Sequence, residues 1–162
     1  MDVNDLRDND PITLSLDKQR LDVGFIHAFL TTSTWAAGIS QERVKMSVDN
    51  SLCVGAYFDQ RQIGFARLVT DFSTFGYLCD VFVDTAYRGR GIGRRLAEAL
   101  LVVPEVRTLR RILLATTTAP LLYESLGFTP VNRPNYLWQL HRPHIYSEGD
   151  CGVDQALGPC RT

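Results

Sequence analysis

The sequence predicts a mixed α/β domain built around a single sheet. Segments with strand-like alternation and segments with helical spacing follow one another, and no internal repeat or low-complexity tract interrupts them. The chain of 162 residues is 45% hydrophobic and 22% charged, which is ordinary for one domain with its own core. We therefore expect one domain at 11–146, after a flexible N-terminus at 1–10 and before a C-terminal tail at 147–162.

The first half of the chain is expected to combine two helices with most of the sheet. Apolar residues alternate in "ITLSL" and recur at helical spacing in "LDVGFIHAFL". The polar turn "DQRQ" separates two apolar runs and indicates a hairpin. The expected elements are a strand at 12–16, helices at 21–30 and 38–48, and strands at 51–58, 63–71 and 76–83.

The second half adds a long helix, a strand, a short helix and a closing pair of strands. The helix "GRRLAEALLV" is expected to stop at Pro104, because proline lacks the N–H that a helix interior uses. Thr118 is expected to cap the short helix at 119–127, which Gly127 ends. The remaining strands are expected at 110–118, 128–131 and 136–142.

Charge and cysteine content exclude several functions. The formal net charge is −1, so no general basic field would recruit nucleic acid or an anionic membrane. The chain carries no apolar run of the roughly 20 residues that span a bilayer, and we expect a cytoplasmic protein. The four cysteines show no metal-ligand spacing, so no metal is expected. Cys53 and Cys79 are interpreted as buried thiols, whereas pairing of Cys151 with Cys160 is left open.

The stretch "DTAYRGRGIGRRLAEAL" suggests a binding site for an anion. Glycines at 89, 91 and 93 let the backbone approach a bulky diphosphate, and the helix that follows presents unpaired N–H groups. Arg88 and Arg94 can add charge-assisted hydrogen bonds, whereas Arg95 is interpreted as part of a solvated helix face. The spacing fits neither the dinucleotide-binding fingerprint nor the P-loop, but it does match Arg-x-x-Gly-x-Gly.

This motif and a second one resemble the GCN5-related N-acetyltransferase (GNAT) superfamily. The first follows a strand ending "VFV", as in that family, and "APLLYESLGF" at 119–128 resembles the second motif, Ala-x-x-Leu-Tyr-x-x-x-Gly-Phe. Two departures are Thr85, where the family often has proline, and Thr118, where it often has Asn or Asp. The resemblance implies one mostly antiparallel mixed sheet of six to seven strands with about four helices, splayed between the fourth and fifth strands.

The resemblance also implies acetyl-CoA as the cosubstrate and assigns residues to it. The fourth strand is expected to carry a bulge and to pair its free backbone groups with the pantetheine amides, and the glycine-rich turn is expected to hold the pyrophosphate. The cofactor-binding residues so assigned are Val81, Phe82, Val83, Arg88, Gly89, Arg90, Gly91, Ile92, Gly93 and Arg94.

Two catalytic residues are assigned in the same way. Tyr123 matches the family tyrosine whose hydroxyl protonates or hydrogen-bonds the departing CoA sulfur. The attacking amine must lose a proton, yet Cys79 and Tyr77 occupy the positions where the family often has a base. Asp80 is the candidate base if a bulge turns it toward the site, and a structural, hydrogen-bonded role is its alternative. Asp71 and a water chain are the fallback.

The leading hypothesis is transfer of acetyl from acetyl-CoA to a primary amine of a small molecule or peptide, by direct attack on the thioester. A CoA-binding sensor or interaction domain without transferase activity is the alternative, and nucleotide phosphotransfer is a minor third. Trp35 and Trp138 either line the acceptor pocket or pack in the core. The family frequently dimerises, so a homodimer is among the expected partners.

Overall fold

The computed structural model describes residues 11–146, and its centre is one five-stranded sheet in the order β1-β2-β3-β4-β5. Neighbouring strands are antiparallel except β4 and β5, which are parallel. The strands are β1 (Ile12–Ser15), β2 (Leu52–Phe58), β3 (Arg61–Thr70), β4 (Phe75–Val83) and β5 (Arg111–Leu113). The expected mixed sheet is confirmed. The predictions for 1–10 and 147–162, including Cys151 and Cys160, lie outside the described residues.

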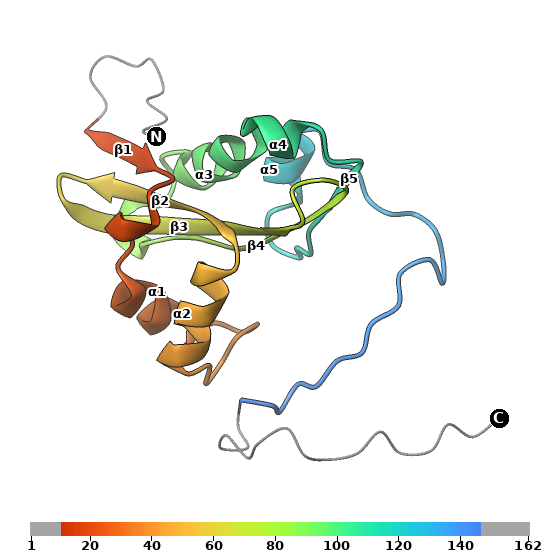
Figure 1. The fold of residues 1–162 in the computed structure, drawn as a ribbon, viewed down its shortest axis with the longest axis horizontal. Helices are drawn as coiled ribbons and strands as arrows, with labels where there is room; N and C mark the ends of the chain where they lie inside the picture. Colours follow the sequence, from red (N-terminus) through yellow and green to blue (C-terminus); the bar gives the residue numbers. More distant parts are fainter. Residues whose placement is uncertain (1–10, 147–162) are drawn as a thin grey trace.

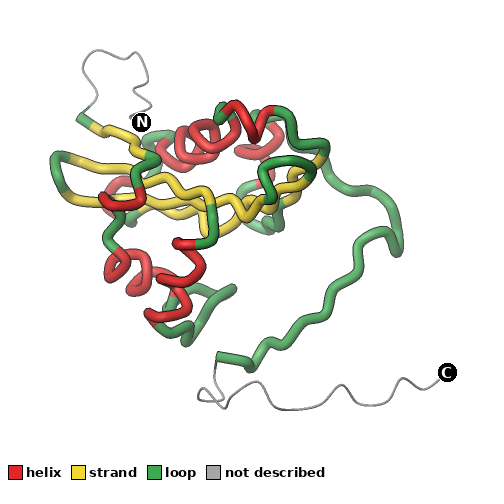
Figure 2. The backbone as a smooth tube through the Cα atoms, viewed as in Figure 1, coloured by secondary structure: helices red, strands yellow, loops and turns green. Residues whose placement is uncertain are grey.

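Helices cover both faces of the sheet (Figures 1 and 2). On one face lie α1 (Val23–Leu30) and α2 (Gln41–Asp49), with side chains such as Ile26 and Val44 buried against the strands. On the other lie α3 (Ile92–Leu101), α4 (Pro104–Arg107) and α5 (Pro120–Glu124). Short 3₁₀ turns at Lys18–Arg20 and Thr85–Tyr87 complete the described elements. Among residues 11–146, no helix combines the length and apolarity that crossing a membrane requires.

The sheet contains five strands in the described part of the chain, against the six to seven expected, because 128–131 and 136–142 form no strands. Pro130 and Pro134 lack the N–H that a sheet ladder needs, which disfavours strands here. Residues 129–146 instead form an arm that leaves the domain near β5 and returns toward α1 and α2 (Figure 1).

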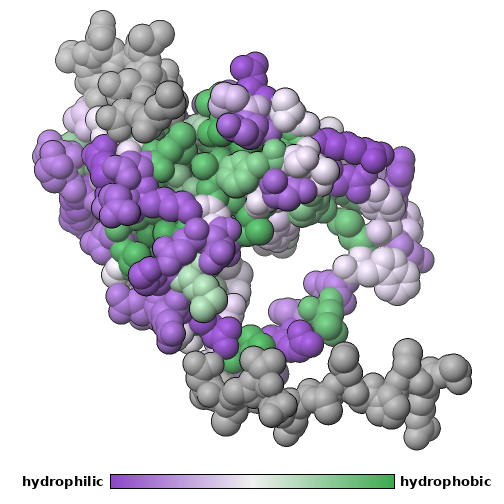
Figure 3. All heavy atoms as spheres, viewed as in Figure 1, coloured by the Kyte–Doolittle hydropathy of each residue, from purple (hydrophilic) through white to green (hydrophobic). Residues whose placement is uncertain are grey.

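The arm exposes apolar side chains, which stand out against its polar residues (Figure 3). Trp138 is 86% exposed and Leu140 is 80% exposed. The Trp138 indole N–H donates to the Asn135 carbonyl at 2.8 Å. The prediction that Trp138 packs in the core is therefore wrong.

Candidate active site

A bulge in β4 sets the direction of its side chains. Phe65 lies opposite Phe82, but Arg67 lies opposite Cys79, so β4 has one more residue than β3 between these pairs. Asp80 has a φ of 52°, in the left-handed region that few residues other than glycine adopt. The bulge expected for this strand is present, and it lies at Asp80.

The bulge turns Asp80 to the face covered by α1 and α2. Leu78 and Val81 both pack into the core under α3, although residues three apart point to opposite faces of a regular strand. Asp80 instead reaches Trp35, in the loop between α1 and α2. Regular alternation continued from Leu78 would have left this carboxylate on the α3 face.

The sheet splays between β4 and β5, as expected. The parallel pairing joins only Phe75–Tyr77 to Arg111–Leu113. Beyond Tyr77, the stretch 78–83 of β4 pairs with β3 and has no β5 partner in the described part of the chain. An extended amide-bearing ligand can pair with such an edge as a further strand would. Val81 is partly buried and Phe82 and Val83 are buried, so their side chains serve packing.

The glycine-rich turn adopts the conformation that its composition indicates. Gly89 and Gly91 have φ values of 77° and 75°, and Gly91 is the N-cap of α3. No side chain caps this helix, so the N–H groups at its first turn are left for a ligand. A Cβ added at either glycine would meet nothing within 4 Å. The turn therefore leaves open space in front of a positively polarised helix end, which suits a diphosphate.

The arginines around this turn are held in different ways. Arg88 donates from Nε to the Val83 carbonyl at 3.1 Å. The Arg90 guanidinium lies 5.4 Å from the centre of the Tyr87 ring. Arg94 pairs with Glu98 at 2.9 Å on the exposed surface of α3, and would have to leave this partner to reach a pyrophosphate.

Arg95 differs from the expected solvated residue. It is partly buried and donates to the Ile12 carbonyl at 3.0 Å, which ties α3 to β1.

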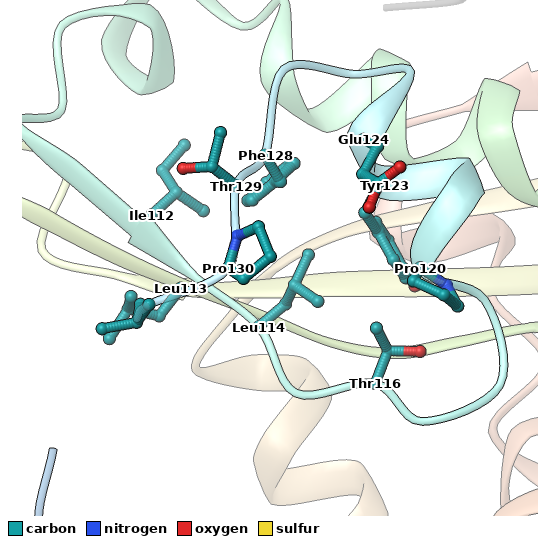
Figure 4. Close-up of a pocket in the computed structure, with 11 residues that line it drawn as sticks. Ile112, Leu113, Leu114, Thr116, Pro120, Tyr123, Glu124, Phe128, Thr129 and Pro130 are labelled. Carbon is teal, nitrogen blue, oxygen red and sulfur yellow. The ribbon is translucent and has the colours of Figure 1, made fainter. Parts of the chain in front are cut away.

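Tyr123 lies in a pocket of about 230 Å³ between β5, α5 and the chain that follows α5 (Figure 4). In Figure 4, Pro120 and Tyr123 lie on α5, with Leu114 and Pro130 across the pocket. The Tyr123 ring packs edge-on against Phe128, with 6.0 Å between ring centres. Burial raises the pKa of Tyr123, so its hydroxyl keeps its proton at neutral pH.

The helix that carries Tyr123 begins differently from the expectation. Its N-cap is Ala119 and not Thr118, and Pro120 occupies its first turn. Thr116 stabilises this start, since its hydroxyl oxygen accepts a hydrogen bond from the Ala119 N–H at 3.2 Å.

Asp80 is held by two donors. Its Oδ1 accepts from the Trp35 indole N–H at 3.0 Å, and its Oδ2 accepts from Arg67 Nε at 2.5 Å. Arg67 also donates to the Ser51 hydroxyl at 3.1 Å. Sequence reasoning missed Arg67, although a charged residue in the apolar run "IGFARLV" signals a buried partner.

Asp71, the fallback base, has a structural role. It accepts a hydrogen bond from the Thr74 hydroxyl and three from backbone N–H groups, and these bonds hold its pKa well below the usual range. Such a carboxylate organises the β3–β4 turn and is a poor proton acceptor. Burial raises the pKa of the Cys79 thiol to about 12, so this thiol stays neutral. Within the described residues, no group of three or more His, Cys, Asp or Glu side chains could hold a metal ion.

Comparisons with known proteins agree with this architecture. The acetyltransferase (GNAT) domain profile matches residues 49–130. A candidate acetyltransferase of Gibberella zeae is 31% identical over an alignment of length 128 that covers 64% of this chain and 71% of the relative. The crystal structure of a candidate GNAT acetyltransferase from Xanthomonas campestris is 42% identical with a TM-score of 0.80, covering 84% of this chain and 96% of its own.

A more distant structure, a candidate acetyltransferase of Clostridium acetobutylicum with acetyl-CoA, shares the fold. It is 16% identical with a TM-score of 0.60 and covers 80% of this chain and 96% of its own. The profile match and the two closer relatives show that the chain belongs to the GNAT acetyltransferase family. Acetyl transfer is the activity of this family, and acetyl-CoA is its acetyl donor.

Proposed function

We propose that the protein is an acetyl-CoA-dependent N-acetyltransferase that acetylates a primary amine. The proposal rests on two features together: an uncapped α3 N-terminus behind two left-handed glycines, and a β4 edge at 78–83 that has no β5 partner among the described residues. The α3 N-terminus suits a diphosphate, and the β4 edge suits an extended chain with amides. Acetyl-CoA contains both and supplies an activated acetyl thioester.

Different parts of the site bind acetyl-CoA and promote the transfer. The glycine-rich turn, with Arg88, Arg90 and Arg94, binds the diphosphate, and the backbone of Val81–Val83 aligns the pantetheine arm. During transfer the amine nitrogen bonds to the acetyl carbon, the carbon–sulfur bond breaks, and the amine loses a proton. Tyr123 gives a hydrogen bond or its proton to the leaving sulfur, which suits a hydroxyl that burial keeps protonated.

Asp80 is the proposed acceptor of the amine proton. Trp35 and Arg67 each bond one of its carboxylate oxygens, which fixes the group beside the free β4 edge. Each oxygen keeps a further lone pair that can receive a proton. The acceptor is a small molecule or peptide, and we expect the reaction to take place in the cytoplasm.

The proposal is tested by calorimetry with acetyl-CoA and by thiol release with a panel of amines. Binding followed by amine-dependent release of CoA supports it. Acetyl-CoA binding without turnover by any amine or peptide would replace it with the sensor function. Asp80→Asn tests the base: its rate deficit should shrink as pH rises toward the amine pKa of about 10.4, because the amine then needs no base. A deficit independent of pH would contradict the proton-accepting role.

A further inference from the structure

A tryptophan beside the β4 bulge is exposed yet held in place. Trp35 lies in the loop between α1 and α2 and is 55% exposed. Its indole N–H donates to Asp80, whose side chain is only 8% exposed. Its ring also packs at a 48° tilt against Phe29, with 6.2 Å between ring centres. A surface tryptophan fixed at both its N–H and its ring is preorganised for contact, since little entropy is left to lose on binding.

The supports of Trp35 come from the strand that we propose aligns the cosubstrate. Asp80 is anchored by Arg67, and Phe29 stacks on Phe82 with 3.8 Å between ring centres and 4° between planes. Asp80 and Phe82 flank Val81, in the stretch of β4 without a β5 partner. The indole is therefore positioned by Asp80 directly and by Phe82 through Phe29, the two residues on either side of Val81.

The end of α1 and the loop that carries Trp35 are uncharged. Residues 28–39, "AFLTTSTWAAGI", contain no charged residue and no histidine. Within residues 11–146, the carboxylate bonded to the indole is that of Asp80, and it is already paired with Arg67. A polyamine needs several carboxylates along its length, and residues 28–39 supply none. An aromatic face instead offers stacking to a flat apolar group and attraction to a single ammonium within about 6 Å.

We propose that Trp35 forms the acceptor subsite, and that the acceptor is a primary monoamine joined through a short linker to an aromatic ring. This inference rests on the proposed N-acetyltransferase function. The ring of the acceptor stacks on the indole, and the amine lies toward Asp80 and the β4 edge. Trp35 thereby selects the substrate, and Asp80 positions Trp35 in addition to its proposed catalytic role.

Steady-state kinetics test the proposal with three probe amines: 2-phenylethylamine, butylamine and spermidine. The wild type should have its highest kcat/KM with 2-phenylethylamine. Trp35→Ala should raise the KM for this amine about threefold to tenfold, because one aromatic contact is lost. The KM for butylamine should rise less than that for 2-phenylethylamine, because only the ring-bearing amine loses a stacking contact, and the KM for acetyl-CoA should change less than twofold. Trp35→Phe, which keeps a ring but loses the N–H, should fall between wild type and Trp35→Ala.

A fluorescence titration gives a readout that needs no turnover. The chain has two tryptophans, so Trp138→Phe leaves Trp35 as the single indole and also serves as the control substitution on the arm. In this variant, 2-phenylethylamine should change the emission saturably, and butylamine should not. If acetyl-CoA binds but no amine turns over, the proposed function fails while the titration still tests the subsite. A preference for spermidine, equal effects of Trp35→Ala on all three amines, or no saturable signal would overturn the proposal.

Discussion

Replacement of Gly91 by alanine tests whether the left-handed cap of α3 is required. Gly91 has a φ of 75°, and an added Cβ would meet nothing within 4 Å, so the cost is one of backbone conformation and not of space. The left-handed conformation costs a residue with a Cβ about 1–2 kcal/mol. For a chain of this size, a destabilisation of that magnitude lowers the melting temperature by about 2–8 °C.

Gly93→Ala is the matched control two residues away. Gly93 lies inside α3, where alanine is favoured over glycine by about 0.5–1 kcal/mol. An added Cβ would make ordinary contacts, at 3.7 Å to Leu122 and 3.9 Å to Val83. Gly93→Ala should therefore be at least as stable as the wild type, and the two variants should differ by roughly 1.5–3 kcal/mol.

The assays are urea unfolding of the free protein and calorimetry with acetyl-CoA. Gly91→Ala should lose both stability and affinity, because relief of the strain moves the N–H groups that face the ligand. Gly93→Ala should keep its affinity, because Gly93 is assigned to the cofactor through its backbone, which alanine retains, and the new methyl group points toward Leu122 and Val83. Equal unfolding free energies for Gly91→Ala and wild type, or equal losses in the two variants, would refute the argument.

Three further predictions concern the site and the core. Tyr123→Phe should lower kcat about 100-fold or more in amine-dependent CoA release, because it removes the hydroxyl that serves the leaving sulfur. The unfolding free energy should change little, since the ring is kept. An unchanged kcat would contradict the role of Tyr123 as the acid. Phe82→Ala should lower the free energy of unfolding, measured in urea, by about 3–5 kcal/mol, since Phe82 is 5% exposed and stacks on Phe29. A loss under 1 kcal/mol would contradict this packing. Burial raises the pKa of Cys53 to about 11 and that of Cys79 to about 12, from an ordinary value of 9.0. Above pH 9 the folded state therefore holds more protons than the unfolded state, and the unfolding free energy should fall from about pH 9 to 11. The fall should be smaller in Cys53→Ala, and an unfolding free energy of the wild type that does not change with pH would contradict the burial.

Local sequence was sufficient for the elements that depend on neighbouring residues. The glycines at 89 and 91 and the helix that follows were predictable, because left-handed turns and helix starts are decided within a few residues. The family followed from two motifs with short fixed spacings.

Alternation alone misled the prediction at 128–131 and 136–142. A strand exists only where another strand offers hydrogen bonds, and the pattern "YLWQL" carries no information about a partner. Pro130 and Pro134 were visible signals against strands there.

Tertiary structure alone decided where the polar groups of the site meet. Asp80 faces Trp35 and Arg67 because one extra residue in β4 shifts the register against β3. A shift of one residue exchanges the two faces of a strand, so the partners of Asp80 depend on the pairing of whole strands and not on the residues beside it. For the same reason, Asp80 could be picked out from the sequence, but its partners Arg67 and Trp35 could not.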